Sequence, residues 1–176
     1  GKYVNIASRC AGFINKRFDG QTGSVVDAEL IGRLSAQADA IAAHYEARRF
    51  SAAIRDTMTL ADEVNAWIAE RAPWVIAKQE GREAELQQVC ATALEAFRLL
   101  TLYLKPVLPK LAARAEAFLG IAPLAWADAA APLLNHRIND YTALITRVDP
   151  KAVEAMVGAS KEDMKVTDDT VAAAAA

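Results

Sequence analysis

Apolar residues recur at helical spacing along most of this chain, and this periodicity constrains the fold more than any other feature. The opening stretch, residues 1–20, shows it most clearly. One side of a helix there would carry the apolar residues Val4, Ile6, Cys10, Phe13 and Ile14, and the other the polar or small residues Asn5, Ser8, Arg9, Gly12 and Lys16. Alanine is common, and Val, Ile and Thr do not alternate as they do in strands, so the sequence predicts helices.

The same spacing, read with turn residues and prolines, predicts where the helices begin and end. We expect helices at about residues 1–18, 27–49, 51–71, 82–104, 109–119 and 150–160, with Ser51 as an N-cap and Pro73 ending the third helix. Residues 121–137 show no clear period and predict an irregular connection, and residues 142–148 could form strand or helix. The predicted fold is all-α: an antiparallel helix bundle over residues 1–120, a C-terminal extension over 121–160 that packs back and ends in a short helix, and a polar and alanine-rich tail or linker over 161–176.

Composition and charge restrict the classes of protein to which the chain can belong. Its 176 residues suffice for one domain with a sizeable core. The net charge is −2, so nucleic-acid binding would need a local patch, and residues 1–20 supply one with a charge of +3. The two cysteines form no CxxC motif and no secretory signal is present, which favours a reducing, cytoplasmic compartment. No apolar run has the length of a membrane span, and a helical period already running at Lys2 suggests a piece of a longer protein.

Motifs that carry enzymatic chemistry are missing from the sequence. We find neither a glycine-rich phosphate loop after a strand nor a GxSxG motif. A di-iron site in a helix bundle needs Glu-x-x-His pairs, and neither His44 nor His136 has a Glu three residues before it. Both histidines are predicted to be surface residues. The sequence therefore predicts no catalytic, metal or cofactor-binding residue.

With no enzymatic motif found, the sequence still offers three side chains that could form a recognition surface. Asn5 and Arg9 are one helical turn apart, and both bear groups that hydrogen-bond the edges of nucleobases. Trp74 follows Pro73 at a helix break. There its indole could plug the end of the bundle, or it could stay exposed as a platform for an unstacked base. Trp67 and Trp126 are predicted to pack in the core. A solvated helix face is the alternative explanation for Asn5 and Arg9.

Three stretches of the chain resemble one known family. The runs Val4–Phe18, Ala72–Lys78 and Tyr103–Pro109 are similar to the anticodon-binding domain of bacterial methionyl-tRNA synthetases, and Leu144–Asp149 resembles the segment that turns back toward the catalytic domain. The likeness extends to about Lys161. The opening run is highly specific, whereas Pro-Trp followed by lysine recurs among class I synthetases. Cys10 stands where the resemblance leads us to expect an asparagine, and it lies beside Asn5 and Arg9.

The resemblance implies a function for this surface and for the parent protein. Asn5 and Arg9 would hydrogen-bond the cytosine that begins the CAU anticodon of initiator and elongator methionine tRNAs, with Pro73 and Trp74 completing the RNA-binding site and Trp74 stacking on that base. The parent would ligate methionine to tRNA with ATP and Mg²⁺ in a catalytic domain that this chain lacks. The fragment would be inactive alone, with methionine tRNA and its own catalytic domain as partners and neither DNA nor membrane among them.

Two alternatives to this assignment stay open at the level of sequence. The chain could be the corresponding domain of another class I synthetase, which would read a different anticodon. It could also be a helical protein-interaction scaffold that does not bind RNA.

Overall fold

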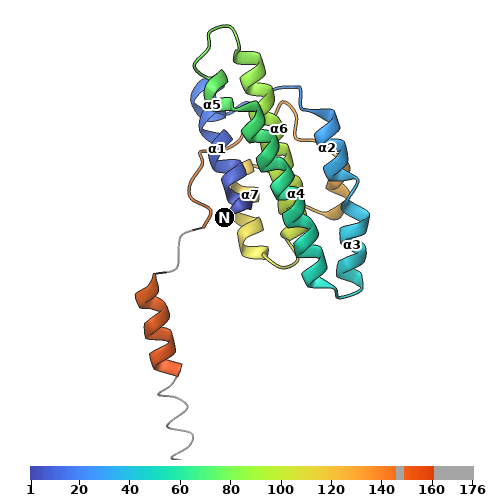
Figure 1. Cartoon of the computed structure of the whole chain (residues 1–176), viewed down its shortest axis with the longest axis vertical. Coiled ribbons are helices and arrows are strands. Elements are labelled where there is room, and N and C mark those ends of the chain that lie inside the picture. Colours follow the sequence, from blue (N-terminus) through green and yellow to red (C-terminus); the bar gives the residue numbers. More distant parts are fainter. Residues whose placement is uncertain (146–148, 161–176) are drawn as a thin grey trace, which may run out of the picture. The chain divides into compact units, whose positions relative to one another are not determined.

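The structure is a computed structural model, and it describes residues 1–145 and 149–160. Its elements are α1 (Lys2–Arg17), α2 (Ala28–Ser35), α3 (Ala38–Glu46), α4 (Phe50–Arg71), α5 (Pro73–Ile76), α6 (Glu83–Leu104), α7 (Pro109–Leu119) and the 3₁₀ helix η1 (Trp126–Ala130), shown in Figure 1. A further helix spans residues 150–160. Within the described ranges there is no strand, only an isolated bridge between Gln21 and Arg137, so the prediction of an all-α bundle is confirmed.

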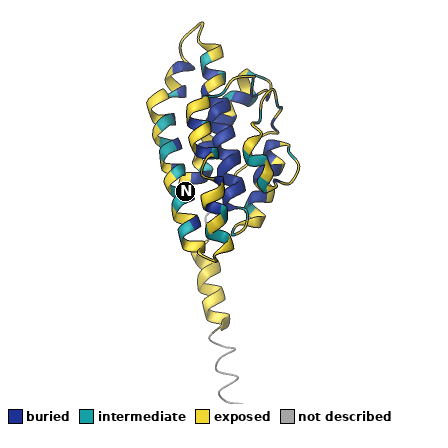
Figure 2. Cartoon of the chain, turned by 90° about the vertical axis from the view of Figure 1, so that its right-hand side faces the viewer, coloured by how far each residue is buried: buried dark blue, intermediate teal, exposed yellow. Residues whose placement is uncertain are grey.

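Helix α6 is the centre of the bundle. It contacts α1, α2, α4, α5, α7 and η1, and every residue from Val89 to Leu104 is buried. Figure 2 shows this buried column between helices whose outer faces are exposed. Apolar residues at helical spacing in residues 82–104 would indicate an amphipathic helix with one exposed face, but from Val89 to Leu104 no face is exposed. The polar residues of a helix that is buried on all sides need hydrogen-bonding partners within the protein. Glu95 and Arg98 of α6 have such partners, as described below.

The two faces predicted for the first helix are confirmed. Ile6, Cys10 and Ile14 are fully buried against α6, whereas Val4 and Phe13 are partly buried. The polar face, Asn5, Ser8, Arg9, Gly12 and Lys16, is exposed throughout. Burying one stripe of α1 in this way fixes the rotation of the helix about its axis, and therefore the direction in which its polar side chains point.

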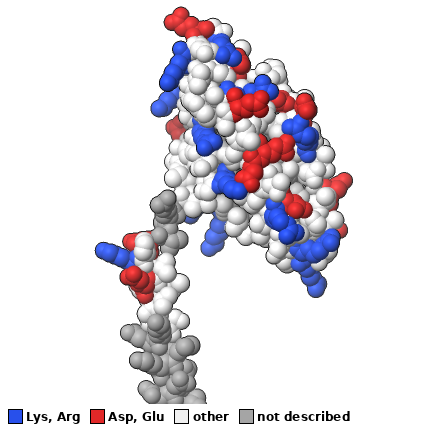
Figure 3. Space-filling view, viewed as in Figure 1, with Lys and Arg blue, Asp and Glu red and all other residues white. Residues whose placement is uncertain are grey.

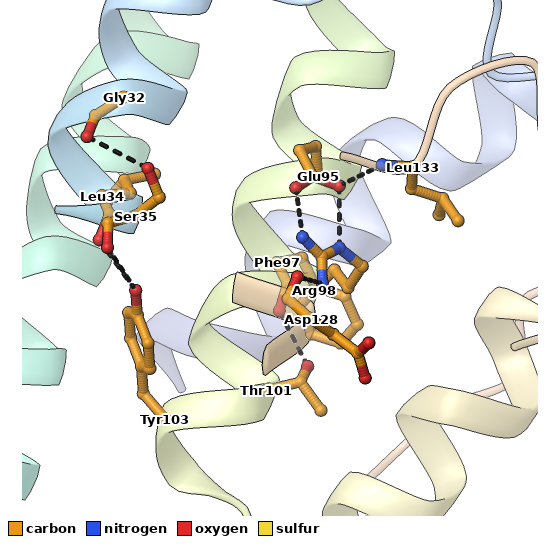
Figure 4. Close-up of polar contacts among 10 residues, drawn as sticks. All are labelled: Gly32, Leu34, Ser35, Glu95, Phe97, Arg98, Thr101, Tyr103, Asp128 and Leu133. Carbon is orange, nitrogen blue, oxygen red and sulfur yellow. Dashed lines mark hydrogen bonds and ion pairs between the residues drawn. The ribbon is translucent and has the colours of Figure 1, made fainter. Parts of the chain in front are cut away.

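The helix predicted over residues 27–49 is two helices, α2 and α3, separated at residues 36–37. In a continuous helix the Leu34 carbonyl would accept the amide of Ala38. Here it accepts the amide of Gln37 at 3.2 Å and the hydroxyl of Tyr103 at 2.9 Å (Figure 4). This contact with α6 favours the break. The predicted N-cap Ser51 is also wrong, because α4 begins one residue earlier, at Phe50.

A buried ion pair fastens the extension to α6 (Figure 4). The Nε and Nη2 atoms of Arg98 donate to the Glu95 carboxylate at 2.9 and 2.6 Å, and Nη1 donates to the Asp128 carbonyl at 2.9 Å. The same carboxylate accepts the Leu133 amide at 2.8 Å. Both charges lie out of water but have polar partners, which is the condition under which a buried pair is tolerated.

A second buried carboxylate, that of Glu116, holds the start of the extension in place. Glu116 accepts the Lys105 ammonium at 2.6 Å and the Leu124 amide at 2.8 Å, and Lys105 also donates to the Leu124 carbonyl at 2.7 Å. Residues 121–137, predicted to form an irregular connection, contain only the short helix η1 and are fixed by specific hydrogen bonds.

The described residues fall into two compact units, 1–144 and the residues that follow. Residues 121–144, which the sequence assigned to a C-terminal extension that packs back, share the first unit with the bundle. The helix at 150–160 belongs to the second unit, and all its residues are exposed. The predicted tail at 161–176 lies outside the described residues, as do residues 146–148 of the segment 142–148, whose described part forms neither helix nor strand.

Candidate nucleic-acid interface

Asn5 and Arg9 lie one turn apart on the exposed face of α1. The backbone carbonyl of Asn5 accepts the Ser8 hydroxyl at 3.1 Å, within the first turns of the helix. Among residues 1–145 and 149–160, no side-chain hydrogen bond or ion pair involves the Asn5 amide or the Arg9 guanidinium. Their hydrogen-bonding groups are therefore available to another molecule.

Pro73 and Trp74 sit where the chain leaves α4. Ala72 adopts a left-handed conformation with φ 44°, which ends α4, and Pro73 opens the single turn of α5 at its first position. Pro73 and Ile76 are buried, so the intervening positions face outward: Trp74 is 41% and Val75 46% exposed. The indole of Trp74 is thus partly exposed rather than buried as a plug in the bundle end. The ring of Pro73 is itself buried, so Pro73 affects this surface only by starting α5.

Helices α1 and α5 both pack against α6, which fixes each of them to the same core element. Asn5 and Arg9 are placed by the buried stripe of α1, and Trp74 by the buried residues of α5. Sequence reasoning did not foresee the exposure of Val75, the residue that follows Trp74 in this turn. The signal for it was the spacing of Pro73 and Ile76, three residues apart on the inward side of one helical turn.

The other two tryptophans pack onto the protein itself. Trp67 is partly buried and its Nε1 donates to Asp27 Oδ2 at 3.3 Å. Trp126 is also partly buried, with its ring centroid 5.7 Å from that of Tyr103. Among the three indoles, Trp74 alone has the exposure that a stacking platform needs.

The charges of residues 1–20 divide into paired and unpaired groups. Lys2 lies 2.7 Å from Asp62, and Asp19 lies 3.0 Å from Arg137. Three cations of the helix make no ion pair with the residues that the structure describes: Arg9, Lys16 and Arg17. In Figure 3, Lys and Arg side chains gather along the upper left edge of the bundle, where Figure 1 draws α1 and α5. This local excess of positive charge suits a phosphate backbone.

Both histidines, predicted to be surface residues, are only partly exposed, and each is hydrogen-bonded to the protein. His44 Nε2 lies 2.9 Å from Asp56 Oδ2, and His136 Nε2 donates to the Leu119 carbonyl at 2.7 Å. Within the described ranges, no group of three or more His, Cys, Asp or Glu side chains could hold a metal ion.

The cysteines are buried on facing helices, α1 and α6, and neither forms a disulfide. A hydrogen bond with the Cys10 thiol, together with burial, raises the pKa of Cys90. The thiol at Cys90 therefore stays protonated and unreactive, as a packing residue does. None of the helices described is both long and apolar enough to span a membrane.

Comparison with known proteins identifies relatives of this bundle. The model of one family, described as the anticodon binding domain of methionyl tRNA ligase, matches residues 18–143. A methionine–tRNA ligase of Chromobacterium violaceum is 52% identical over 99% of this chain and 26% of its own length. One from Thiobacillus denitrificans is 52% identical over 95% of this chain and 24% of its own length. The chain thus spans about a quarter of the length of these relatives.

Solved structures show the same fold. The ligand-free methionyl-tRNA synthetase of Mycobacterium tuberculosis superposes with a TM-score of 0.75 at 23% identity, covering 83% of this chain and 32% of that protein. The same enzyme bound by methionyl-adenylate gives a TM-score of 0.75 at 22% identity, over 83% of this chain and 31% of that protein.

Proposed function

The chain belongs to the family of methionyl tRNA ligase anticodon binding domains, and on that premise we propose that α1 and α5 together bind the CAU anticodon of initiator and elongator methionine tRNAs. The observations that carry the proposal are an exposed indole, Trp74 of α5, and two side chains without protein partners, Asn5 and Arg9 of α1, on two helices that both pack against α6. Single-stranded loops are read in this way, because their bases can be splayed out, stacked on an aromatic ring and hydrogen-bonded along their edges.

Each side chain has a separate role in this proposal. The indole of Trp74 stacks on the cytosine that begins the anticodon. The guanidinium of Arg9 donates to acceptors on the base edge, and the Asn5 amide can both donate to and accept from it. Lys16 and Arg17 attract the phosphate backbone without reading sequence.

The activity of the longer protein is part of the proposal as well. We infer that the chain works as one part of a cytoplasmic methionine–tRNA ligase, whose catalytic domain uses ATP and Mg²⁺ to join methionine to tRNA. That catalytic domain is then its protein partner, and the present chain binds tRNA without catalysing a reaction. DNA and membranes are not partners in this proposal.

Truncating the platform tests the proposal. We expect Trp74→Ala to weaken binding of a CAU anticodon stem-loop by about 1–3 kcal/mol, the usual value of one base stacked on an aromatic side chain. Val75→Ala is the matched control, since it removes an exposed apolar side chain from the same turn. Isothermal titration of both variants measures the difference. Equal affinities for wild type and Trp74→Ala would refute this role for the indole.

Arginine variants separate base reading from backbone attraction. We expect Arg9→Ala to lose discrimination at the first anticodon base, by about 1–3 kcal/mol if the contact is bidentate. Arg17→Ala should weaken binding similarly for all sequences, as a phosphate contact does. A uniform loss in both variants would contradict the assignment of Arg9 as a base reader.

A scaffold that does not bind RNA predicts a different result. An anticodon stem-loop that stacks on Trp74 should quench its fluorescence, and the quenching should weaken as salt rises. Absence of quenching at both low and high salt would support the scaffold instead.

A further inference from the structure

Gly12 occupies an unusual position for a glycine. It lies in the interior of α1, is exposed, and a Cβ built on it would meet no heavy atom within 4 Å. Glycine in a helix interior is less favourable than alanine, because its backbone loses more freedom on folding. Nothing in the fold therefore requires a glycine at this point.

The residue sits in the middle of the proposed RNA-binding face. It follows Asn5 by seven residues and Arg9 by three, and it precedes Lys16 by four, so all four lie along one side of the helix. Arg9 and Lys16 make no ion pair with the described residues, and no carboxylate lies on this stripe of exposed residues. The surface around Gly12 is thus a bare stretch of helix backbone between two unpaired cations.

Gly32, a second exposed glycine within a helix, provides a comparison for Gly12. Gly32 of α2 is also exposed, and a Cβ there would also meet nothing within 4 Å. Its neighbour Arg33, however, is held by Glu29 at 2.8 Å and by Glu63 at 2.9 Å. Arg33, the only cation of α2, is thus engaged by carboxylates of α2 and α4, and α2 offers no unpaired cation to an anionic ligand.

We propose that Gly12 is the point of closest approach between α1 and the anticodon strand of the RNA. The absence of a side chain lets a ribose and its phosphate lie against the helix backbone. From that position the Arg9 guanidinium reaches the base edge and the Lys16 ammonium reaches a phosphate. Gly12 is in this sense a positioning residue that sets the distance between the strand and its readers. The inference rests on the proposed function, whose RNA ligand it takes as given.

Two substitutions of Gly12, by a small and by a large side chain, test the inference in this 176-residue chain. Gly12→Ala and Gly12→Leu should each make the helix more stable and raise the Tm, by about 2–4 °C for alanine. They should nevertheless weaken binding of a CAU anticodon stem-loop, with the leucine variant losing about tenfold, equivalent to one lost base contact. The alanine variant should lose less than the leucine variant. A protein that gains stability while losing affinity cannot owe the loss to misfolding.

The controls are Gly32→Ala and Gly32→Leu, which should raise the Tm in the same way and leave RNA affinity unchanged. Equal affinity of wild type and Gly12→Leu for the CAU stem-loop would overturn the role of Gly12 while leaving the proposed function intact. Equal losses in the Gly12 and Gly32 variants would also overturn it. If wild type itself shows no preference for CAU over other anticodons, the proposed function fails, and this inference fails with it.

Discussion

The buried ion pair between Glu95 and Arg98 permits a quantitative prediction about how residues 126–133 are attached to the bundle. The side chains of Arg98 and Glu95 are only 3% and 1% exposed. Arg98→Ala would remove the guanidinium donors that lie 2.6 and 2.9 Å from the Glu95 carboxylate, together with the one 2.9 Å from the Asp128 carbonyl. The carboxylate would keep the Leu133 amide as its partner but would remain buried without a countercharge.

The loss of stability follows from this geometry. Leaving one member of a buried ion pair without its partner costs about 3–5 kcal/mol. In a chain of this size that corresponds to a Tm lower by roughly 6–20 °C. An exposed ion pair with the same three-residue spacing at the start of α6, between the N-cap residue Arg82 and Glu85, should contribute less than about 1 kcal/mol.

Urea unfolding, followed by circular dichroism, measures both values. Arg82→Ala serves as the matched control for Arg98→Ala, and a double variant, Glu95→Met with Arg98→Met, removes both buried charges. The double variant should recover much of the stability lost by Arg98→Ala, because no unpaired charge stays in the core. A loss in Arg98→Ala no larger than in Arg82→Ala would refute the description of this pair as buried and essential.

Two further predictions concern the stability of the bundle. Asp27→Ala should lower the free energy of unfolding by about 1–2 kcal/mol, because Asp27 caps α2 through the Leu30 amide at 3.0 Å and also accepts the Trp67 indole N–H; thermal unfolding checks it. Burial raises the pKa of Tyr103 from 10.0 to about 12, so its contribution to stability is complete below pH 10 and is lost as the pH rises through 12. Tyr103→Phe should therefore make the decline in stability between pH 10 and 12 shallower, as urea titrations across that range would show, and an unchanged slope would count against it.

The sequence predicts those features that depend on local spacing. The two faces of α1 follow from the position of apolar residues such as Ile6 and Ile14, and the ends of α7 follow from Pro109 and Gly120. Asn5 and Arg9 share a face for the same reason, so their placement one turn apart on one side of a helix could be predicted from the sequence.

Features that depend on distant contacts could not be predicted. The break between α2 and α3 coincides with a hydrogen bond from Tyr103, 69 residues beyond Leu34. The exposure of Trp74 depends on the left-handed conformation of Ala72, which is unusual for alanine and has no signature in the sequence. Likewise, the burial of α6 on every side from Val89 to Leu104 arises from the packing of the other helices around it.

Binding of two anticodon stem-loops to the wild-type chain tests the central claim most directly. The two RNAs should differ only in the first anticodon base, with cytosine in one and uracil in the other, and both should be titrated in the same buffer and salt. We predict that the CAU stem-loop binds more tightly by about 1–3 kcal/mol, which is the discrimination expected of a bidentate contact to a base edge. Equal affinities for the two stem-loops would contradict the assignment of this surface as a reader of that base.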